Sequence, residues 1–483
     1  MLQLALVSTA AATSFNGTHF HTNSYRHTQQ VSYPVDRPGH VRSSGAATIR
    51  DCIARKDSPR GEGSCSQAAL FSRMHSRGVM KKKQQEHDAC VVAGECPLNR
   101  AFASSTPCVD GKAGQYECSG IDLLSFVPIA ALGSTMDASD IWGWTDSTTG
   151  DEIAIINVMD GTSFVQVTDP THPVVLGFLP STSKDHVIWA DTKVFADHAF
   201  IVRESRDSGV QIFDLSSLRP YYGKASSFPR QLVQDAWYDQ VSTSHNAVMN
   251  EETGFLYVVG TSTCQGGLHA IDVHEPTQPT FAGCFDLDGY THDAQCVIYR
   301  GADKSYVGKE VCFNYNEDTL TIVDVSDKSD MKMLARETYD NAEYTHQGWL
   351  THDMKYLLLN DELDELNGPE PRTRTMMWDL ADLTQPKLIA SHYPPNGVVS
   401  IDHNLYITAD DKAYLADYSS GLRVLDASTI ATGVTKEIAF FDLCDYSDKV
   451  EFKGAWSSYP FFQSKAIIVS SIELGLFVLK LQV

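Results

Sequence analysis

From residue 121 onward the chain consists of short runs in which apolar, β-branched residues alternate with polar ones, with turn-forming residues between them. One type of run recurs, an apolar stretch that ends in Asp and usually follows a Gly. Its positions are 161–166, 209–214, 267–272, 319–324, 375–379, 421–426 and 475–480. The first and last copies lack the Asp, and successive copies begin 46 to 58 residues apart. This period is typical of a β-propeller, in which each repeat forms one blade of about four strands.

The residues around each copy divide a repeat into four strands, A to D. The third repeat shows this order well, with expected strands at 245–249, 255–259, 267–273 and 280–284. The seventh repeat provides only strands A to C, because the sequence ends before a fourth. Residues 121–129 resemble the expected D strand 173–180 of the first repeat. Since an open ring would leave backbone groups unpaired, we expect this N-terminal strand to close the seventh blade.

The N-terminal part has a different character. Residues 1–14 form a short apolar run followed by small residues, which resembles a signal peptide, although the usual basic start is missing. Residues 15–107 are rich in Ser, Gly, His and Arg, without sustained apolar periodicity. We expect a Cys-containing leader of low order here, followed by an all-β, seven-bladed propeller over residues 108–483. No run approaches the roughly 18 to 20 apolar residues of a membrane span.

Charge separates the same two regions. The whole chain has a formal net charge of -23, but residues 121–483 hold 24 basic and 52 acidic side chains, a balance of -28. A nucleic-acid-binding face requires clustered Lys and Arg, so this balance argues against nucleic acid as a partner. The basic leader with its run Lys81-Lys82-Lys83 is more typical of a solvated stretch.

Eleven cysteines occur and none has the Cys-x-x-Cys spacing of a zinc ribbon or a thioredoxin site. Beside a signal-like start, they indicate disulfides and a secreted or cell-surface protein. The expected pairs are Cys108 with Cys118, Cys264 with Cys284, and Cys296 with Cys312, which leaves Cys444 as the odd residue. Reduced, buried thiols in a cytosolic protein are the alternative.

Several motifs resemble those of the choice-of-anchor B proteins, whose units are LVIVD repeats. They lie at 140–146, 161–165, 244–246, 289–296, 344–349, 361–365, 401–404 and 454–456, together with Cys108-Val-Asp-Gly and Cys118. The resemblance covers residues 108–483 and implies an exported propeller-like protein, often held at the cell surface by an exchangeable C-terminal anchor. No anchor pattern follows the repeats here, which favours a freely secreted or leader-tethered protein. The family implies no established activity, so function has to be argued from the residues.

The starts of the seven A strands carry one polar residue each. These residues are Asp140, Asp191, His245, His292, His346, His403 and Lys453. Because the A strand is innermost in a propeller, we expect them to converge on the central channel. Imidazole and carboxylate ligands suit Zn, Mn, Fe, Ni or Cu. The absence of Cys at this register argues against a thiolate site. The alternative is a solvated polar channel without metal. Six other histidines, at 186, 198, 269, 274, 352 and 392, are expected in loops or at the surface.

The loops between B and C strands should open on the same face as the A-strand starts, and they are acidic. The stretch Asn360-Asp-Glu-Leu-Asp-Glu365 supplies Asp361, Glu362, Asp364 and Glu365, which resemble the oxygen ligands of Ca²⁺. A solvated acidic loop is the more common explanation. The tryptophans at 142, 144, 189, 349 and 456 recur near the A strands and are expected between blades, with a sugar-stacking platform as the minor alternative.

No Gly-x-Ser-x-Gly elbow, P-loop or Gly-x-Gly-x-x-Gly motif is present, so ordinary hydrolase and nucleotide chemistry lack support. Three functions remain open. The first is an extracellular binding protein with a metal at its hub. The second is a metal-dependent hydrolase or oxidoreductase, with Asp140 or Asp191 as the candidate base. The third is a metal-free module whose ligand is a protein, a glycan or a small molecule.

Overall fold

The computed structural model describes residue 85 and residues 105–226, 229–395 and 397–482. The chain divides into two compact units after Gly63, and all described residues belong to the second. The expected signal peptide, and nearly all of the expected leader, lie outside the described residues. Among the described residues no helix is long and apolar enough to cross a membrane.

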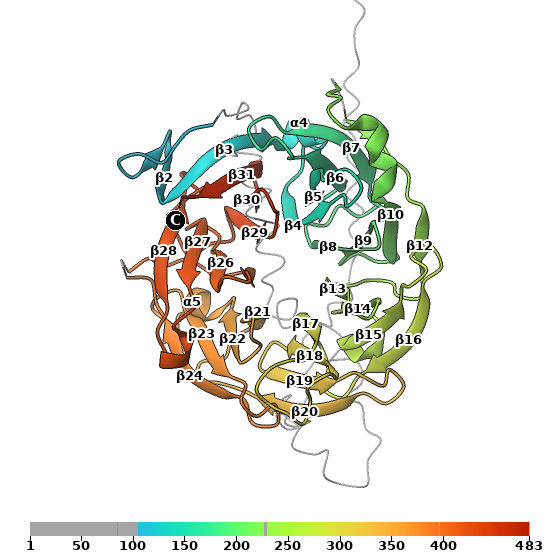
Figure 1. Ribbon diagram of the computed structural model, residues 1–483, viewed down its shortest axis with the longest axis vertical. Helices are drawn as coiled ribbons and strands as arrows, with labels where there is room; N and C mark the ends of the chain where they lie inside the picture. The colour runs from blue at the N-terminus through green and yellow to red at the C-terminus, as the bar shows by residue number, and fades with distance from the viewer. Residues whose placement is uncertain (1–84, 86–104, 227–228, 396, 483) are drawn as a thin grey trace, which may run out of the picture. The chain divides into compact units, whose positions relative to one another are not determined.

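Seven sheets, each with four antiparallel strands that form a blade, surround a common centre (Figure 1). The first blade contains β4 (Ala138–Thr145), β5 (Glu152–Val158), β6 (Gly161–Gln166) and β7 (Val174–Pro180). The second contains β8 (Ala190–Phe195), β9 (His198–Arg203), β10 (Val210–Asp214) and β12 (Ala236–Tyr238). The third contains β13 (Asn246–Asn250), β14 (Phe255–Val259), β15 (Leu268–Asp272) and β16 (Thr280–Phe285). The next two contain β17 (Asp293–Ile298), β18 (Glu310–Tyr315), β19 (Leu320–Asp324) and β20 (Lys332–Glu337); and β21 (Thr345–Leu350), β22 (Tyr356–Asp361), β23 (Thr375–Asp379) and β24 (Lys387–His392).

The last two blades contain β25 (Leu405–Ile407), β26 (Lys412–Ala416), β27 (Leu422–Asp426) and β28 (Lys436–Phe441); and β29 (Ala455–Tyr459), β30 (Ala466–Ser471), β31 (Gly475–Leu481) and β3 (Ile121–Pro128). The innermost strand of each blade contacts that of the next blade, and β29 contacts β4. The molecule is therefore a seven-bladed β-propeller, as the period predicts. The seven recurring runs are the third strands, β6, β10, β15, β19, β23, β27 and β31.

Burial explains why the third strands carried the clearest sequence signal. All five residues of β19 are buried, because neighbouring strands and blades cover both of its faces. Its neighbour β20, at the outer edge, is mostly exposed or half-buried. A strand covered on both faces is mostly apolar, whereas an edge strand tolerates charge. The third and fourth strands also share a register shift at the same place in several blades, as between Ile322 and Val323, which bends the outer strand.

The longest interval between repeats, 58 residues, belongs to the second blade. Between β10 and β12 the chain inserts the 3-10 helix η2 (Leu215–Tyr221) and β11 (Arg230–Gln231). Strand β11 leaves its own blade and pairs in parallel with β7 of the first blade. The other short elements are α4 (Ile129–Leu132), α5 (Asp364–Asn367), η3 (Cys264–Gly266) and η4 (Ile430–Thr432).

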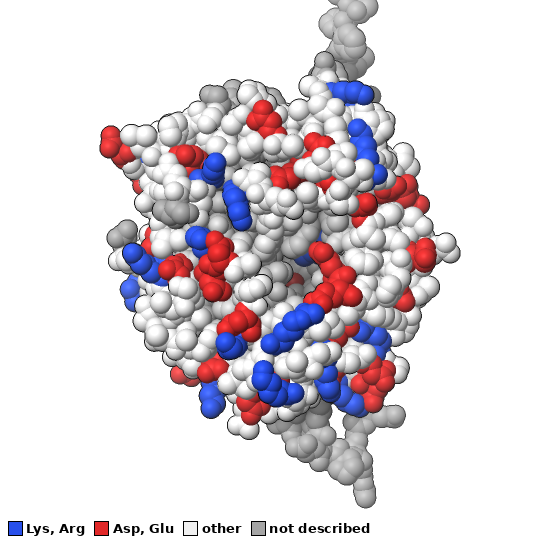
Figure 2. Space-filling view, in the orientation of Figure 1, with Lys and Arg blue, Asp and Glu red and all other residues white. Residues whose placement is uncertain are grey.

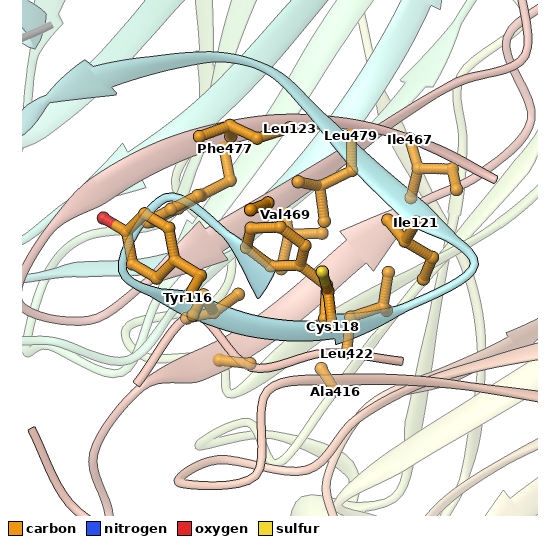
Figure 3. Packing of buried hydrophobic residues seen from close by; sticks show 14 of the residues in the cluster. Tyr116, Cys118, Ile121, Leu123, Ala416, Leu422, Ile467, Val469, Phe477 and Leu479 are labelled. Atoms are coloured by element: carbon orange, nitrogen blue, oxygen red, sulfur yellow. The ribbon is translucent and has the colours of Figure 1, made fainter. Parts of the chain in front are cut away.

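The segment before the first blade joins the last one. Strand β3 runs antiparallel to β31, from Ile121 opposite Leu481 to Pro128 opposite Gly475. Before it, β1 (Lys112–Ala113) and β2 (Tyr116–Ser119) form a hairpin whose second strand pairs with the edge of β28. Figure 3 shows the apolar cluster beneath this segment, where the ring of Tyr116 lies beside Phe477.

The three expected disulfides are all formed. They join Cys108 to Cys118, Cys264 to Cys284 and Cys296 to Cys312. Cys444 is the free, buried cysteine among the described residues, as the pairing predicted. The four other cysteines of the sequence precede residue 105 and lie outside the described residues.

Candidate metal centre at the hub

Four histidines form a continuous row at one level of the hub. His245, His292, His346 and His403 stand at the start of the innermost strands of four successive blades and are all buried. Neighbouring imidazole centroids are 4.2, 4.3 and 4.4 Å apart along the row. The A-strand register therefore brings together the four histidines that were selected from the sequence.

Trp189 and Trp456 extend the row at either end, and the six side chains border a pocket of about 10 Å³, enough for about one water molecule. The expected members from the other three blades differ. In the second blade the pocket is bordered by Trp189, two residues before the expected Asp191. In the seventh blade it is bordered by Trp456 and not by the expected Lys453.

Asp140 and Asp191 thus do not border this pocket and instead hold a buried lysine. Lys193 Nζ lies 2.6 Å from Asp191 Oδ1 and 3.9 Å from Asp140 Oδ2. Asp191 also accepts a hydrogen bond from the backbone N–H of Ala247, in the next blade. Strand β8 begins at Ala190, so Trp189 rather than Asp191 stands directly before it, as His245 and His292 stand directly before β13 and β17. Asp140 lies inside β4, as its third residue. The two aspartates join adjacent blades and are poorly placed to act as a base at the histidine row.

The carboxylate of the site comes from an acidic loop. Glu362 follows β22, is almost fully buried, and its Oε2 lies 3.7 Å from His346 Nε2, while its Oε1 lies 3.8 Å from His403 Nε2. The three ligand atoms lie within 4.8 Å of one another, the one such group among the described residues. Tyr418 Oη donates a hydrogen bond to Glu362 Oε1 at 2.7 Å. A His–Glu–His group of this kind could hold a metal ion.

Hydrogen bonds to the backbone orient two of the imidazoles. His292 Nδ1 donates to the carbonyl of His346 at 2.9 Å, and His403 Nδ1 donates to that of Trp456 at 2.5 Å. Because a carbonyl can only accept, the proton is on Nδ1, and the Nε2 lone pair remains for a ligand. Burial and the neighbouring imidazoles hold the pKa of His292 well below its usual value, so its ring is neutral at physiological pH. Neutral imidazole is the form that binds metal.

His245 has a different partner at the other end of the row. Its Nδ1 lies 2.6 Å from Glu204 Oε2, a carboxylate in the loop after β9. Carboxylates that bind the outer nitrogen of an imidazole commonly orient it toward a metal and raise its basicity. Two of the acidic B–C loops thus each send one carboxylate to the histidine row.

The rest of the acidic stretch is engaged within the protein. Asp361 accepts hydrogen bonds from the backbone N–H groups of Glu343, Tyr344 and Leu363. Asp364 lies 2.7 Å from Arg374 Nη2, and Glu365 accepts from the Arg374 backbone N–H. Glu362 is directed to the histidines, so the four carboxylates expected to hold Ca²⁺ have separate partners. A Ca²⁺ site in this loop stays a prediction.

Two of the six remaining histidines are buried, contrary to expectation. His269 lies between blades, with Nε2 2.7 Å from Tyr238 Oη and Nδ1 2.8 Å from Thr263 Oγ1. His392, in β24, is also buried. Burial lowers the pKa of both, to about 4 in His269. Their positions on strand faces directed between blades, rather than in loops, explain the error.

Comparison with known proteins bears on the fold. The family model for the LVIVD repeat matches residues 311–338, which span β18 to β20. A search of curated proteins gives no match. Similar solved structures include a protein from Lactobacillus plantarum, at 11% identity over 69% of this chain and 89% of that chain, with a TM-score of 0.45. They also include the Cps50 (Swd1) β-propeller domain from Myceliophteria thermophila, at 10% identity over 71% and 96%, also with a TM-score of 0.45. The chain is a β-propeller that carries an LVIVD repeat in its fourth blade.

Proposed function

We propose that this protein is a secreted or cell-surface propeller of the choice-of-anchor B type, which binds a transition-metal ion at its hub as part of an extracellular binding function. The ligands are His346, Glu362 and His403, with His292 as the fourth. The observation that carries the proposal is the convergence of two imidazoles and one carboxylate, all buried. Nitrogen and oxygen donors without thiolate favour Zn, Mn, Fe, Ni or Cu.

The cysteines support an extracellular location. Six of the seven described cysteines are paired in disulfides, and such bonds persist in oxidising compartments. The apolar start of the sequence, interpreted as a signal peptide, agrees with export. A partner or ligand for the propeller would then be a protein, a glycan or a small molecule outside the cell.

Metal analysis of the protein purified without chelator tests the proposal. We expect about one transition-metal ion per chain, and loss of most of it in Glu362→Gln and in His403→Ala. His172→Ala removes an exposed imidazole and His269→Gln removes a buried one outside the row. Both controls should retain the metal if they fold. Absence of stoichiometric metal in the wild type, or equal loss in the controls, would reject the hub site and favour a metal-free binding module.

One further observation favours a metal-dependent enzyme as the second candidate. The pocket beside the row accommodates about one water molecule. His245, which borders this pocket and contacts Glu204, would accept the proton of that water molecule. A metal-bound water with an adjacent base suits hydrolysis. In that case Glu204→Gln would keep the metal but lose most activity toward an activated ester, whereas in a pure binding protein the wild type would show no metal-dependent turnover.

A further inference from the structure

A second cavity lies further along the same innermost strands. It has a volume of about 350 Å³, within the range of small-molecule sites. Strand β21 contributes His346 to the histidine row and then Gln347 and Trp349 to this cavity. Strand β17 likewise is preceded by His292 at the row and contributes Asp293 to the cavity. The two sites therefore occupy successive levels of one hub and are lined by different side chains.

One side of the cavity is a continuous aromatic wall drawn from four blades and the loop after β29. Its members are Trp142, Trp349, Tyr406, Tyr459 and Phe461. Adjacent rings meet edge to face, with centroids 5.1 Å apart for Trp142 and Tyr459, and 5.0 Å apart for Trp349 and Tyr406. Rings packed in this way are held rigidly and present both apolar surface and π faces to the cavity.

The third and fourth blades contribute carboxylates to the same cavity. Glu252 is neutralised by Arg300, whose Nη1 lies 2.6 Å from its Oε1. Asp293 and Glu251 have no salt bridge within 4.0 Å to a basic side chain among the residues that the structure describes. The basic side chain at the cavity, Lys193, is already bound to Asp191. These two carboxyl groups are therefore available to a bound cation.

The aromatic wall already binds one cationic side chain of the protein, that of Lys193. Its Nζ lies 4.5 Å from the centroid of the Trp142 ring, a cation–π contact. The chain therefore already places an ammonium group against one ring of this wall. The rest of the wall has no such cation among the described residues.

The neutral polar groups of the cavity are already used by the protein. Gln347 exchanges two hydrogen bonds with the backbone of Leu405, at 3.0 and 2.9 Å. Gln295 accepts from the backbone N–H of Leu350, and Asn250 donates to Glu310. A sugar needs several amide or hydroxyl partners for its own hydroxyl groups, and these side chains are engaged. The aromatic faces and the two carboxylates remain.

We propose that this cavity is a binding site for an organic cation, an ammonium group on a small apolar body. The positive charge lies against the aromatic wall and faces Asp293 and Glu251, and the apolar body fills the remaining volume. The site uses none of the hub ligands, so it does not depend on the metal.

Calorimetric titration of the full chain with choline tests this, with 3,3-dimethyl-1-butanol as the neutral probe of the same shape. We expect choline to bind about tenfold more tightly than the alcohol, which is the effect of a cation on a desolvated aromatic site. Trp349→Leu should weaken choline binding about tenfold, and Glu251→Gln a few-fold. The matched controls Trp237→Leu and Glu275→Gln, both exposed on outer parts of the propeller, should leave it unchanged.

The remaining arms separate this site from the hub. His403→Ala should lose the metal and keep choline binding, because the two sites share no ligand. Equal affinity for choline and the alcohol would overturn the cationic character, and saturable binding of methyl glucoside in preference to choline would make the cavity a sugar site. No binding of choline would overturn the proposal. Glu251 is exposed, so its variant remains informative if Trp349→Leu does not fold.

Discussion

Asp417 illustrates how the structure encloses individual carboxyl groups. It follows β26, is buried, and its Oδ1 has no hydrogen bond within the described part of the chain. Burial raises its pKa to about 7, with a smaller opposing effect from Arg423. A carboxyl group without a close cation is more stable in the neutral form when it is buried.

The pH dependence of stability follows from this shift. The folded pKa is about 7 and the unfolded pKa is about 3.9. Between these two pKa values the unfolded chain loses the proton while the folded state retains it. The free energy of unfolding therefore falls as the pH rises toward 7. Between pH 5 and pH 8 the wild type should lose about 2 to 3 kcal/mol relative to Asp417→Asn, in which this group cannot ionise. Urea unfolding of both proteins at the two pH values measures the difference, and parallel profiles would contradict the prediction.

At the scale of elements, each blade is held by its third strand and, in two blades, by a disulfide as well. Cys296 and Cys312 face each other across β17 and β18. Cys264, in η3 beside β15, is joined to Cys284 in the outer strand β16. The second bond therefore ties the exposed edge of the third blade to the loop that precedes its buried strand.

Replacing Cys264 and Cys284 by Ser should destabilise the third blade. The bond closes a loop with a sequence separation of 20 residues, which corresponds to about 3 kcal/mol in the chain-entropy model. Hydrogen exchange should increase first in β16, while the seventh blade is little affected. Thermal unfolding measures the overall loss, and an unchanged midpoint in the double variant would show that the bond adds no stability.

At the scale of the whole molecule, the ring joins segments from both ends of the described chain. Strand β3 lies more than 340 residues before its partner β31, and Phe126 in β3 packs on Phe477 with ring centroids 4.7 Å apart. Figure 2 shows a hollow at the centre of one face of this ring, bordered by acidic and basic side chains. An acidic propeller with its carboxylates near such a hollow would raise the local concentration of cations.

Deletion of the chain through Pro128 should leave the edge of β31 unpaired. Backbone groups at an exposed edge favour pairing with another chain, so we expect oligomers and an earlier, broader thermal transition. Size-exclusion chromatography and circular dichroism measure both effects. A shorter deletion that ends before Thr106, where the described pairing begins, is the matched control. A monomeric, fully cooperative protein without β3 would contradict this role.

Much of the fold and part of the site could be predicted from sequence, and each error has a local cause. The four histidines were identified because each blade starts its innermost strand in a similar register. Asp140 and Asp191 were misplaced because β4 begins before Asp140 and β8 begins before Asp191, and the repeat period does not show where a strand begins. Glu362 was noticed, but as part of a separate Ca²⁺ loop. Its approach to His346 and His403 depends on how the loop after β22 folds over the hub.

The sequence by itself determined the number of blades, their third strands and the three disulfide pairs, because these depend on local alternation and on cysteines close along the chain. Only the tertiary structure decided which polar residues share one level of the hub. It also decided that the aromatic rings of several blades enclose one cavity with Asp293 and Glu251. Residues that are hundreds of positions apart in the sequence meet there. A change of one or two residues in the register of an innermost strand decides which side chains meet. The period of a repeat fixes a blade to within a few residues, whereas a binding site depends on single side chains.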